Sequence, residues 1–277
     1  MISNIEEYIS DLVKSDSDIM IKSYIPIYRE IKEGRPDPWG TGILFEYNEN
    51  YFLVSAAHVI LDIKEPLFIP YENDFWSLTG ECAGIELPNS NKREEDIFDF
   101  AFTKLESDVV EKLKIEYYFL RIENIELNFI PKKGDICIVS GYPASKNTKG
   151  INPNSRHVKR LPYLLWDTIN LEQEVFSEIN ASNKFNFLVK YNKSKVKHNG
   201  MIQEGIDPYG MSGGGIWYIT DPLKVTNNKK LIGIGIQYRS KQKVIVCTKF
   251  LLIFSALVKF YNLSLNKDLK IVDVKIN

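Results

Sequence analysis

Residues 210–215 read Gly-Met-Ser-Gly-Gly-Gly, so that Ser212 lies among four glycines. Because glycine has no side chain, the Ser212 hydroxyl would be unobstructed, and neighbouring backbone N–H groups could turn towards one point. This arrangement suits a nucleophilic serine whose backbone neighbours stabilise a developing oxyanion. A flexible loop without a chemical role is the alternative interpretation.

A nucleophilic serine needs a histidine that accepts its proton. The chain has only three histidines, His58, His157 and His198. His58 follows two alanines at the end of a candidate hairpin, whereas the other two lie in loops rich in Lys and Arg that we interpret as solvated. A structural histidine at a strand end is the alternative for His58. It is nevertheless the candidate base.

The same chemistry needs a buried carboxylate that orients the histidine. Residues 96–102 read Asp-Ile-Phe-Asp-Phe-Ala-Phe, which places Asp99 at the start of an apolar strand. Asp96 is the competing candidate, and an aspartate that only binds nearby backbone in a turn is the structural alternative. We select Asp99 because it directly precedes the apolar run.

The order of these residues separates the serine hydrolase folds. Residues 210–214 also match the G-x-S-x-G elbow of α/β-hydrolases, but that fold requires a histidine after the serine, and none follows Ser212. A subtilisin order could use Asp37 before His58, but the alternating helices and strands of that fold are missing from the pattern. The order His58, Asp99, Ser212 remains.

The rest of the chain consists mainly of short segments rich in Ile, Tyr, Phe and Val, separated by turn clusters such as residues 33–38. We expect strands over residues 21–29, 42–47, 51–56, 66–70, 98–105, 135–140, 163–168, 185–191, 214–219, 231–238 and 243–248. Helical spacing is confined to residues 3–14, 108–114 and 250–263. The pattern predicts an antiparallel sandwich or barrel.

Three segments, 56–58 (Ala-Ala-His), 99–101 (Asp-Phe-Ala) and 210–214, resemble the signature blocks of chymotrypsin/trypsin-like serine peptidases in their bacterial, disulfide-free form. The resemblance implies a mainly β fold of two antiparallel six-stranded β-barrels with short N-terminal and C-terminal helices. The expected division is a helical extension over 1–19, a first barrel over 20–130, a second barrel with a helix over 131–262, and a tail over 263–277.

The resemblance also implies the roles of the site residues. Ser212 would be the nucleophile, His58 the general base and Asp99 the orienting carboxylate, with the backbone N–H groups of Gly210 and Ser212 as the oxyanion hole. The expected activity is that of an endopeptidase that acts on protein or peptide substrates without a metal or organic cofactor. The alternatives are an esterase with the same residues, or a latent binding or sensor module controlled by a partner protein.

The specificity pocket is less defined. The resemblance places Ile206 at its base, with Asp207 beside it, and a pocket wall over residues 233–238 that includes Gln237 and Tyr238. Ile206 at the base would favour an apolar or small substrate side chain, whereas Asp207 there would favour Lys or Arg. We favour an apolar preference.

The residue before the nucleophile, Met211, departs from the family pattern. Members that are activated by cleavage carry an aspartate there, which pairs with a newly formed N-terminal amine, and a methionine cannot form that ion pair. We infer that the usual propeptide switch is missing. Control by the N-terminal helix or by a regulatory protein partner is our hypothesis.

Composition excludes other classes of function. The 277 residues contain 35 Lys plus Arg and 36 Asp plus Glu, a net charge of −1, so we expect no general attraction to nucleic acid. The three cysteines form no metal-binding pair and predict a reduced compartment. The longest apolar run, residues 250–258, is far shorter than the roughly 20 residues of a membrane span, and no export signal is visible. We expect a cytoplasmic protein that does not bind membranes.

Overall fold

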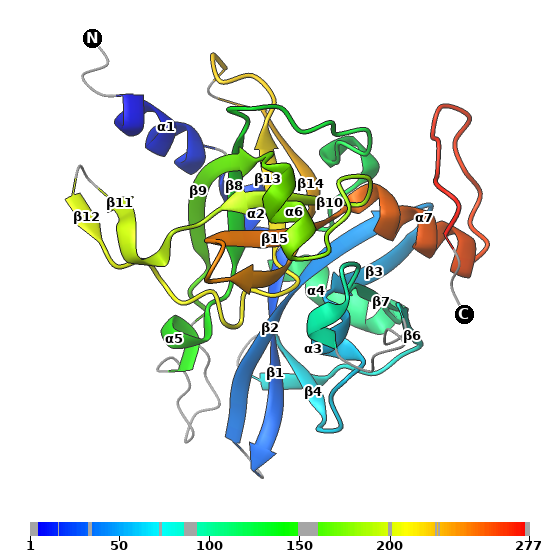
Figure 1. The fold of residues 1–277 in the computed structure, drawn as a ribbon. Helices are drawn as coiled ribbons and strands as arrows, with labels where there is room; N and C mark the ends of the chain where they lie inside the picture. Colours follow the sequence, from blue (N-terminus) through cyan, green and yellow to red (C-terminus); the bar gives the residue numbers. More distant parts are fainter. Residues whose placement is uncertain are drawn as a thin grey trace.

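The computed structural model describes residues 5–15, 17–32, 35–71, 74–85, 93–148, 160–198, 201–224, 226 and 228–274. The chain is mainly β, with two sheets whose facing sides meet in the middle of the molecule (Figure 1). The predicted fold class is therefore confirmed at this level. His157 lies outside the described residues, as do residues 1–4 and 275–277 of the expected terminal segments.

The first sheet is an open, antiparallel sheet of seven strands in the order β5-β4-β1-β2-β3-β7-β6. Its strands are β1 (Tyr24–Lys32), β2 (Arg35–Tyr47), β3 (Asn50–Ser55), β4 (Leu67–Tyr71), β5 (Asp74–Ser77), β6 (Cys82–Gly84) and β7 (Ala101–Lys104). The expectation of a closed six-stranded barrel is wrong here. The edge strands β5 and β6 are only four and three residues long, and within the described residues they do not pair with each other.

The second sheet is a closed barrel of six antiparallel strands in the order β10-β15-β14-β13-β8-β9. Its strands are β8 (Ile136–Gly141), β9 (Tyr163–Asn170), β10 (Asn186–Lys190), β13 (Gly215–Ile219), β14 (Lys229–Arg239) and β15 (Val244–Lys249). Alternate residues of these strands, such as Cys137, Val139, Phe187 and Val189, fill a buried apolar cluster inside the barrel. A separate two-stranded ribbon, β11 (Val196–His198) with β12 (Met201–Gln203), lies beside it.

Three helices match the expected ones: α1 (Ile5–Lys14), α4 (Ser107–Glu116) and α7 (Phe250–Phe260). Four short helices were not expected: α2 (Ser17–Lys22), α3 (Ala57–Ile60), α5 (Ala144–Asn147) and α6 (Gln173–Glu178). Although α7 follows the last barrel strand, it also packs against the first sheet (Figure 1), where Phe254 lies edge-on to Tyr47 at the end of β2 and Phe260 lies edge-on to Phe102 on β7. Helix α7 therefore connects the barrel to the open sheet.

Two hydrogen bonds also connect the segment before Asp99 to the barrel. The Asn186 side chain on β10 donates to the Ile97 carbonyl at 2.5 Å, and the Thr248 hydroxyl on β15 donates to the Phe98 carbonyl at 2.6 Å. The Phe98 ring packs edge-on against Phe185 at the same contact. Because an unsatisfied buried polar group is costly, these bonds fix the segment before Asp99 against the barrel.

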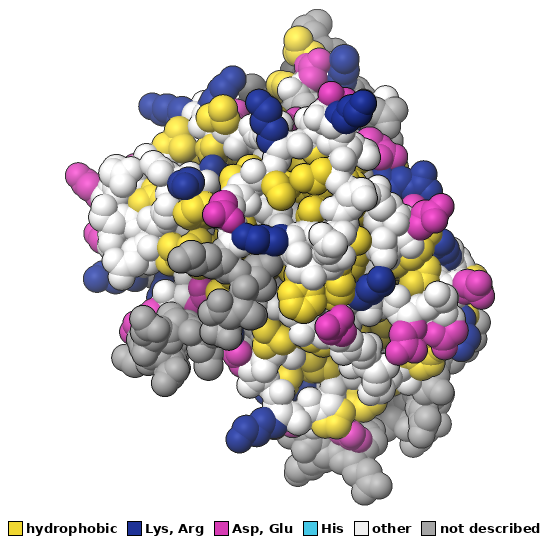
Figure 2. Space-filling view, turned by 90° about the vertical axis from the view of Figure 1, so that its right-hand side faces the viewer, with side chains coloured by type: hydrophobic (Ala, Val, Ile, Leu, Met, Phe, Trp, Pro, Cys, Tyr) yellow, Lys and Arg dark blue, Asp and Glu magenta, His cyan; other side chains and the backbone are white. Residues whose placement is uncertain are grey.

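The surface carries charges of both signs. On the face shown in Figure 2, Lys and Arg side chains are interspersed with Asp and Glu side chains, and apolar side chains lie between them. This mixture matches the net charge of −1. Among the described residues, no helix is long and apolar enough to cross a membrane.

Candidate active site

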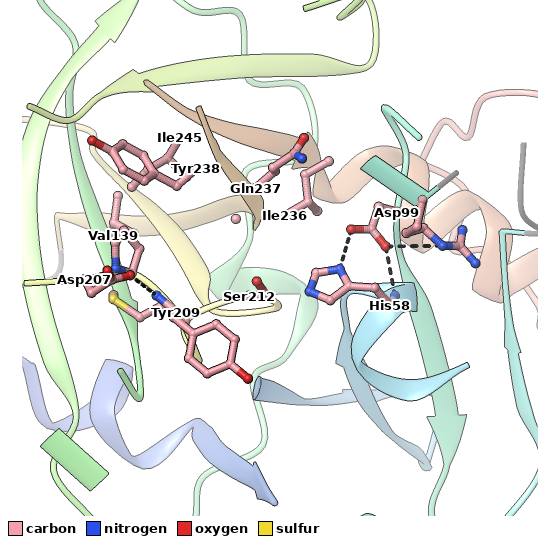
Figure 3. A pocket seen from close by; sticks show the side chains of 14 residues that line it. His58, Asp99, Val139, Asp207, Tyr209, Ser212, Ile236, Gln237, Tyr238 and Ile245 are labelled. Carbon is pink, nitrogen blue, oxygen red and sulfur yellow. Dashed lines mark hydrogen bonds and ion pairs between the residues drawn. The ribbon is translucent and has the colours of Figure 1, made fainter. Parts of the chain in front are cut away.

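His58 is presented by α3, the single helical turn that directly follows β3. Ala56 and Ala57 before it are completely buried, so their small side chains let this turn pack closely against the sheet. The His58 side chain is 29% exposed and lines a cavity between the two sheets. One ring edge is therefore buried while the other faces the cavity (Figure 3).

Asp99 contacts His58 through both carboxylate oxygens. Its Oδ2 lies 2.7 Å from the ring Nδ1 of His58, and its Oδ1 accepts the backbone N–H of His58 at 3.0 Å. The Asp99 carbonyl also accepts the Ala57 N–H at 3.2 Å. Asp99 has a φ of +34°, a conformation that costs free energy and persists only where surrounding contacts enforce it. The backbone is therefore held in an unusual shape that directs this carboxylate at the histidine.

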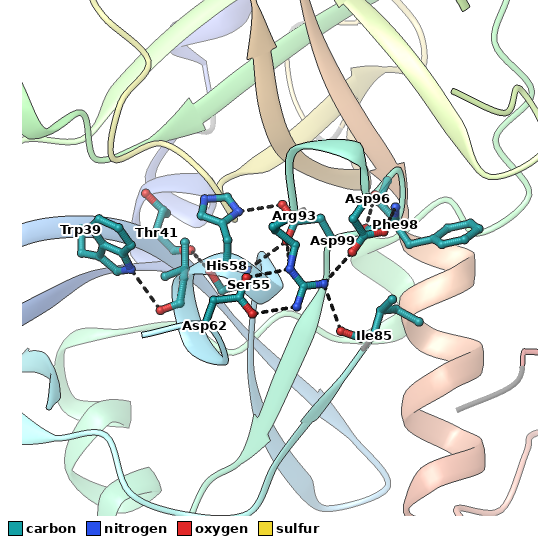
Figure 4. Close-up of polar contacts among 12 residues, drawn as sticks. Trp39, Thr41, Ser55, His58, Asp62, Ile85, Arg93, Asp96, Phe98 and Asp99 are labelled. Carbon is teal, nitrogen blue, oxygen red and sulfur yellow. Dashed lines mark hydrogen bonds and ion pairs between the residues drawn. The ribbon is translucent and has the colours of Figure 1, made fainter. Parts of the chain in front are cut away.

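Asp96, the competing acid, has different partners. Its Oδ1 accepts the Phe98 N–H at 2.8 Å, and its Oδ2 pairs with Arg93 at 2.6 Å. Asp96 is buried. Among the described residues, it makes no hydrogen bond with His58. The structure brings Asp99 and not Asp96 to the histidine (Figure 4).

Ser212 lies in a tight turn that only glycines allow. Gly210 and Gly213 have φ values of +88° and +83°, in the region that favours glycine. A Cβ at Gly213 would meet the Ser55 hydroxyl at 2.1 Å and the Thr41 carbonyl at 2.2 Å, so the turn packs directly against the first sheet. Ser212 lines the same cavity as His58 (Figure 3), although no hydrogen bond joins these two described residues.

The backbone N–H groups of Gly210 and Ser212 are oriented by the carbonyls of their own peptide units. The Tyr209 carbonyl accepts the Ala144 N–H, and the Met211 carbonyl accepts the Gly214 N–H, both at 2.8 Å. In a trans peptide the N–H points opposite to the carbonyl. Both N–H groups therefore point away from these contacts, and neither donates a hydrogen bond to any residue that the structure describes. They are two fixed donors beside the Ser212 hydroxyl.

Thr41 on β2 connects the first sheet to the serine turn. Its N–H donates to the Ser212 carbonyl at 2.9 Å. Its hydroxyl donates to the Gly210 carbonyl and accepts the Tyr142 N–H, both at 2.9 Å. Thr41 is completely buried. The sequence does not reveal this role of Thr41, because a threonine between two glycines carries no recognisable signal.

The cavity measures about 450 Å³. Besides the three candidate residues, its lining is mainly apolar and aromatic, and it also includes polar and charged groups. The apolar and aromatic residues are Val139, Pro208, Tyr209, Met211, Ile236, Tyr238 and Ile245, and the others are Gly235, Arg93, Asp207 and Gln237. Asp207, Gln237 and Tyr238, which were proposed for the specificity pocket, are thus among the residues that line this cavity. Ile206 is not among the lining residues; its side chain packs against the barrel core, and its carbonyl accepts the Tyr191 hydroxyl.

The charge of Asp207 is offset by a neighbour. Lys193 donates to its carboxylate at 2.8 Å, and the Tyr209 N–H donates at 3.1 Å. These hydrogen bonds lower the pKa of the Asp207 carboxyl. The Asp207 side chain is 55% exposed, so it lies at the solvent-exposed rim of the cavity and not at its base.

Met211 is buried in the barrel core, where it belongs to the same apolar cluster as Val139 and Ile245. The helix α1 lies elsewhere: Tyr8 donates to the Pro222 carbonyl, and Lys229 donates to the Ser15 carbonyl just after the helix. No described residue of α1 lines the cavity. Nor do the described residues contain a group of three or more His, Cys, Asp or Glu that could hold a metal ion.

The fold is similar to that of solved structures. One is the crystal structure of the serine endoprotease from Yersinia pestis, with a TM-score of 0.50 and 14% sequence identity. The match covers 92% of this chain and 66% of that chain, so the chain spans less than two thirds of the length of that protein. No family model and no curated protein matches the sequence. The likeness at this identity concerns the fold alone.

Proposed function

We propose that the protein is a serine endopeptidase that hydrolyses peptide bonds through an acyl-enzyme intermediate. The observation that carries the proposal is the double contact of Asp99 with His58 beside a serine turn that holds two unpaired N–H donors. The similarity to the fold of a serine endoprotease supports it. Fold alone does not determine function, and the contacts of His58, Asp99 and Ser212 therefore carry the proposal.

The proposed reaction begins at the His58 ring. A hydrogen bond from Nδ1 to Asp99 keeps the proton on Nδ1, so Nε2 can accept the proton of the Ser212 hydroxyl. The Ser212 oxygen attacks the substrate carbonyl, and the N–H groups of Gly210 and Ser212 stabilise the oxyanion. His58 then returns the proton to the leaving amine. A water molecule, activated in the same way, hydrolyses the ester and frees Ser212.

We further propose that the cavity takes an apolar side chain of the residue before the cleaved bond. Met211, Val139 and Ile245 form an apolar lining, and burying such a side chain against it is favourable. Asp207 is neutralised by Lys193 at the rim, so it does not select Lys or Arg. Gln237 and Tyr238 on β14 form a wall of the same cavity.

The second candidate function is a latent or weak peptidase that serves as a sensor or binding module under the control of a partner protein. The observation that favours it is the missing hydrogen bond between Ser212 and His58. Catalytic hydrogen bonds are often loose without substrate, so this feature fits an active enzyme as well. The contacts of α1 give no support to gating by that helix.

The proposal also covers the division of the chain and the cellular compartment. The chain would divide into functional halves over residues 20–130 and 131–262, with terminal segments over 1–19 and 263–277 and the site between the halves. The three cysteines are free, with two of them buried, which fits a reducing compartment such as the cytoplasm.

The experiment is cleavage of a library of unstructured peptides, with the new termini mapped by mass spectrometry. We expect cleavage after apolar residues by the wild type and none by Ser212→Ala. Asp207→Asn should keep the same preference, because Asp207 is already neutralised. Cleavage after Lys or Arg that Asp207→Asn removes would contradict the proposed pocket. Activity that appears only with an added partner would favour the sensor module.

A further inference from the structure

Arg93 lies at the centre of three carboxylates beside His58 (Figure 4). It begins the short 3-10 helix η1 (Arg93–Glu95), and its side chain is only 11% exposed. Its Nε and Nη2 donate to the two oxygens of Asp62, each at 2.7 Å, and its Nη1 donates to Asp96 at 2.6 Å. Its Nε lies 4.0 Å from Oδ1 of Asp99. One guanidinium thus faces three acidic groups.

The positive charge of the Arg93 guanidinium stabilises the three carboxylates around it. The Asp96 and Asp99 side chains are 3% and 5% exposed, and buried carboxylates are costly unless a counter-charge is close. Burial by itself would lower the pKa of Arg93, but hydrogen bonds to Asp62 and Asp96 and the charge of Asp99 outweigh it and raise that pKa. Without Arg93 the three carboxylates would repel one another around His58.

The contacts of Arg93 also join separate parts of the chain. Asp62 follows the helical turn α3 that carries His58, whereas Asp96 belongs to the segment that carries Asp99. The Nη1 group also donates to the Ile85 carbonyl, just after β6, at 3.2 Å. A guanidinium is a planar group that makes two parallel bonds to one carboxylate, so it fixes direction as well as distance. Arg93 therefore sets the separation of the two segments.

We propose that Arg93 is a positioning residue that holds the Asp99 carboxylate in register with the His58 ring. The proposal rests on the proposed peptidase function. Asp99 Oδ1 receives the His58 N–H on one side and faces Arg93 on the other, while Oδ2 meets the ring. Losing Arg93 lets the carboxylate turn away from Nδ1, and the ring loses its orientation.

The kinetic test compares Arg93→Gln in two backgrounds. In the wild type we expect kcat to fall about 10²-fold with KM little changed, the cost of a misplaced catalytic group. Arg93→Lys should restore only part of the rate, because an ammonium lacks the planar fork. In an Asp99→Asn background, Arg93→Gln should change kcat little further. An equal loss in both backgrounds would show that Arg93 does not act through Asp99, and an unchanged wild-type kcat would overturn the proposal.

A second readout does not depend on turnover. The proton of a ring N–H bound to a carboxylate gives a distinct NMR resonance, which His58→Gln assigns among the three histidines. Arg93→Gln should shift or remove the His58 signal, whereas Arg160→Gln should leave it unchanged. Arg160 is the matched control, because it is a half-buried arginine paired with Glu116 at 2.7 Å and does not line the cavity.

The two readouts separate the failure of the two proposals. If the wild type cleaves no peptide but the His58 resonance responds to Arg93→Gln, the peptidase function fails and the role of Arg93 stands. If Arg93→Gln leaves the resonance unchanged, the role of Arg93 is wrong whatever the activity. If Arg93→Gln does not fold, Asp62→Asn is the alternative variant, because it removes the carboxylate that binds two nitrogens of the Arg93 guanidinium. Asp62→Asn should shift the same His58 resonance. An unchanged resonance would contradict the proposal.

Discussion

Asp99 binds His58 at two points: its Oδ2 lies 2.7 Å from the ring Nδ1, and its Oδ1 accepts the backbone N–H of His58 at 3.0 Å. The ring cannot rotate without breaking the first contact, and the helical turn cannot shift without breaking the second. Because the proton lies on Nδ1 when it binds a carboxylate, Nε2 is left as the acceptor that faces Ser212. This relationship fixes both the place and the tautomer of the proposed base.

Replacing Asp99 by Asn should lower kcat on the order of 10⁴-fold, because the amide would stabilise the wrong tautomer of His58. Steady-state cleavage of a mapped peptide measures the effect. Asp96→Asn should cost much less, since Asp96 binds Phe98 and Arg93 instead. A larger loss for Asp96→Asn than for Asp99→Asn would show that the acid is Asp96.

Thr41→Val should lower the free energy of unfolding by about 1–3 kcal/mol, because it leaves the Gly210 carbonyl and the Tyr142 N–H buried without their partner. It should also lower kcat, since the serine turn loses its attachment to the first sheet. Thr103→Val is the control: Thr103 is equally buried in the same sheet but contacts Cys82. Equal kcat values for the two variants would remove Thr41 from the support of the site.

Gly210→Ala should lower kcat by about 10²–10³-fold, the effect of losing one oxyanion donor. An added Cβ would meet the Ala144 nitrogen at 2.7 Å and the Tyr142 carbonyl at 2.8 Å, so the turn must shift. Gly134→Ala is a matched control, because Gly134 has a similar φ of +90° but no atom within 4 Å of the added Cβ. If Gly134→Ala reduced kcat as much, backbone strain alone would explain both variants.

Thiol titration of the native protein should find one reactive cysteine. Cys82 is exposed, whereas Cys137 and Cys247 are completely buried in the barrel, and burial raises the pKa of both of these thiols. Because the thiolate is the reactive form, only Cys82 should react until the protein unfolds. Three fast thiols in the native state would mean that the barrel is open.

The sequence was most informative where chemistry needs particular residue types in a particular order. The absence of a histidine after Ser212 decided between hydrolase folds, and the apolar run after Asp99 distinguished it from Asp96. The strands of the barrel were also predictable, because their buried apolar residues recur at short spacing. The open first sheet was not, because the residues of β5 and β6 are too few to give a pattern.

Other features depend on contacts between distant segments. Residues 35–38 contain two prolines, and the sequence predicts a turn there. In the structure they form the first part of β2 and pair with β1. The lining of the cavity combines Val139 with Ile245, which only the closure of the barrel brings together. Arg93 stands in a run of mixed charges that normally indicates a solvated loop. Its burial follows from its pairing with Asp62, 31 residues earlier in the chain, and from its closeness to the buried Asp96 and Asp99.

The most direct test of the account is labelling of the folded protein with a fluorophosphonate, followed by mass spectrometry of its peptides. The reagent reacts rapidly with a serine that a neighbouring base activates. We expect one adduct, on Ser212, that is lost in Ser212→Ala and strongly slowed in His58→Ala. An adduct on another residue, labelling that survives in Ser212→Ala, or a folded wild type that takes no label would contradict the claim that His58 and Ser212 form an active nucleophilic pair.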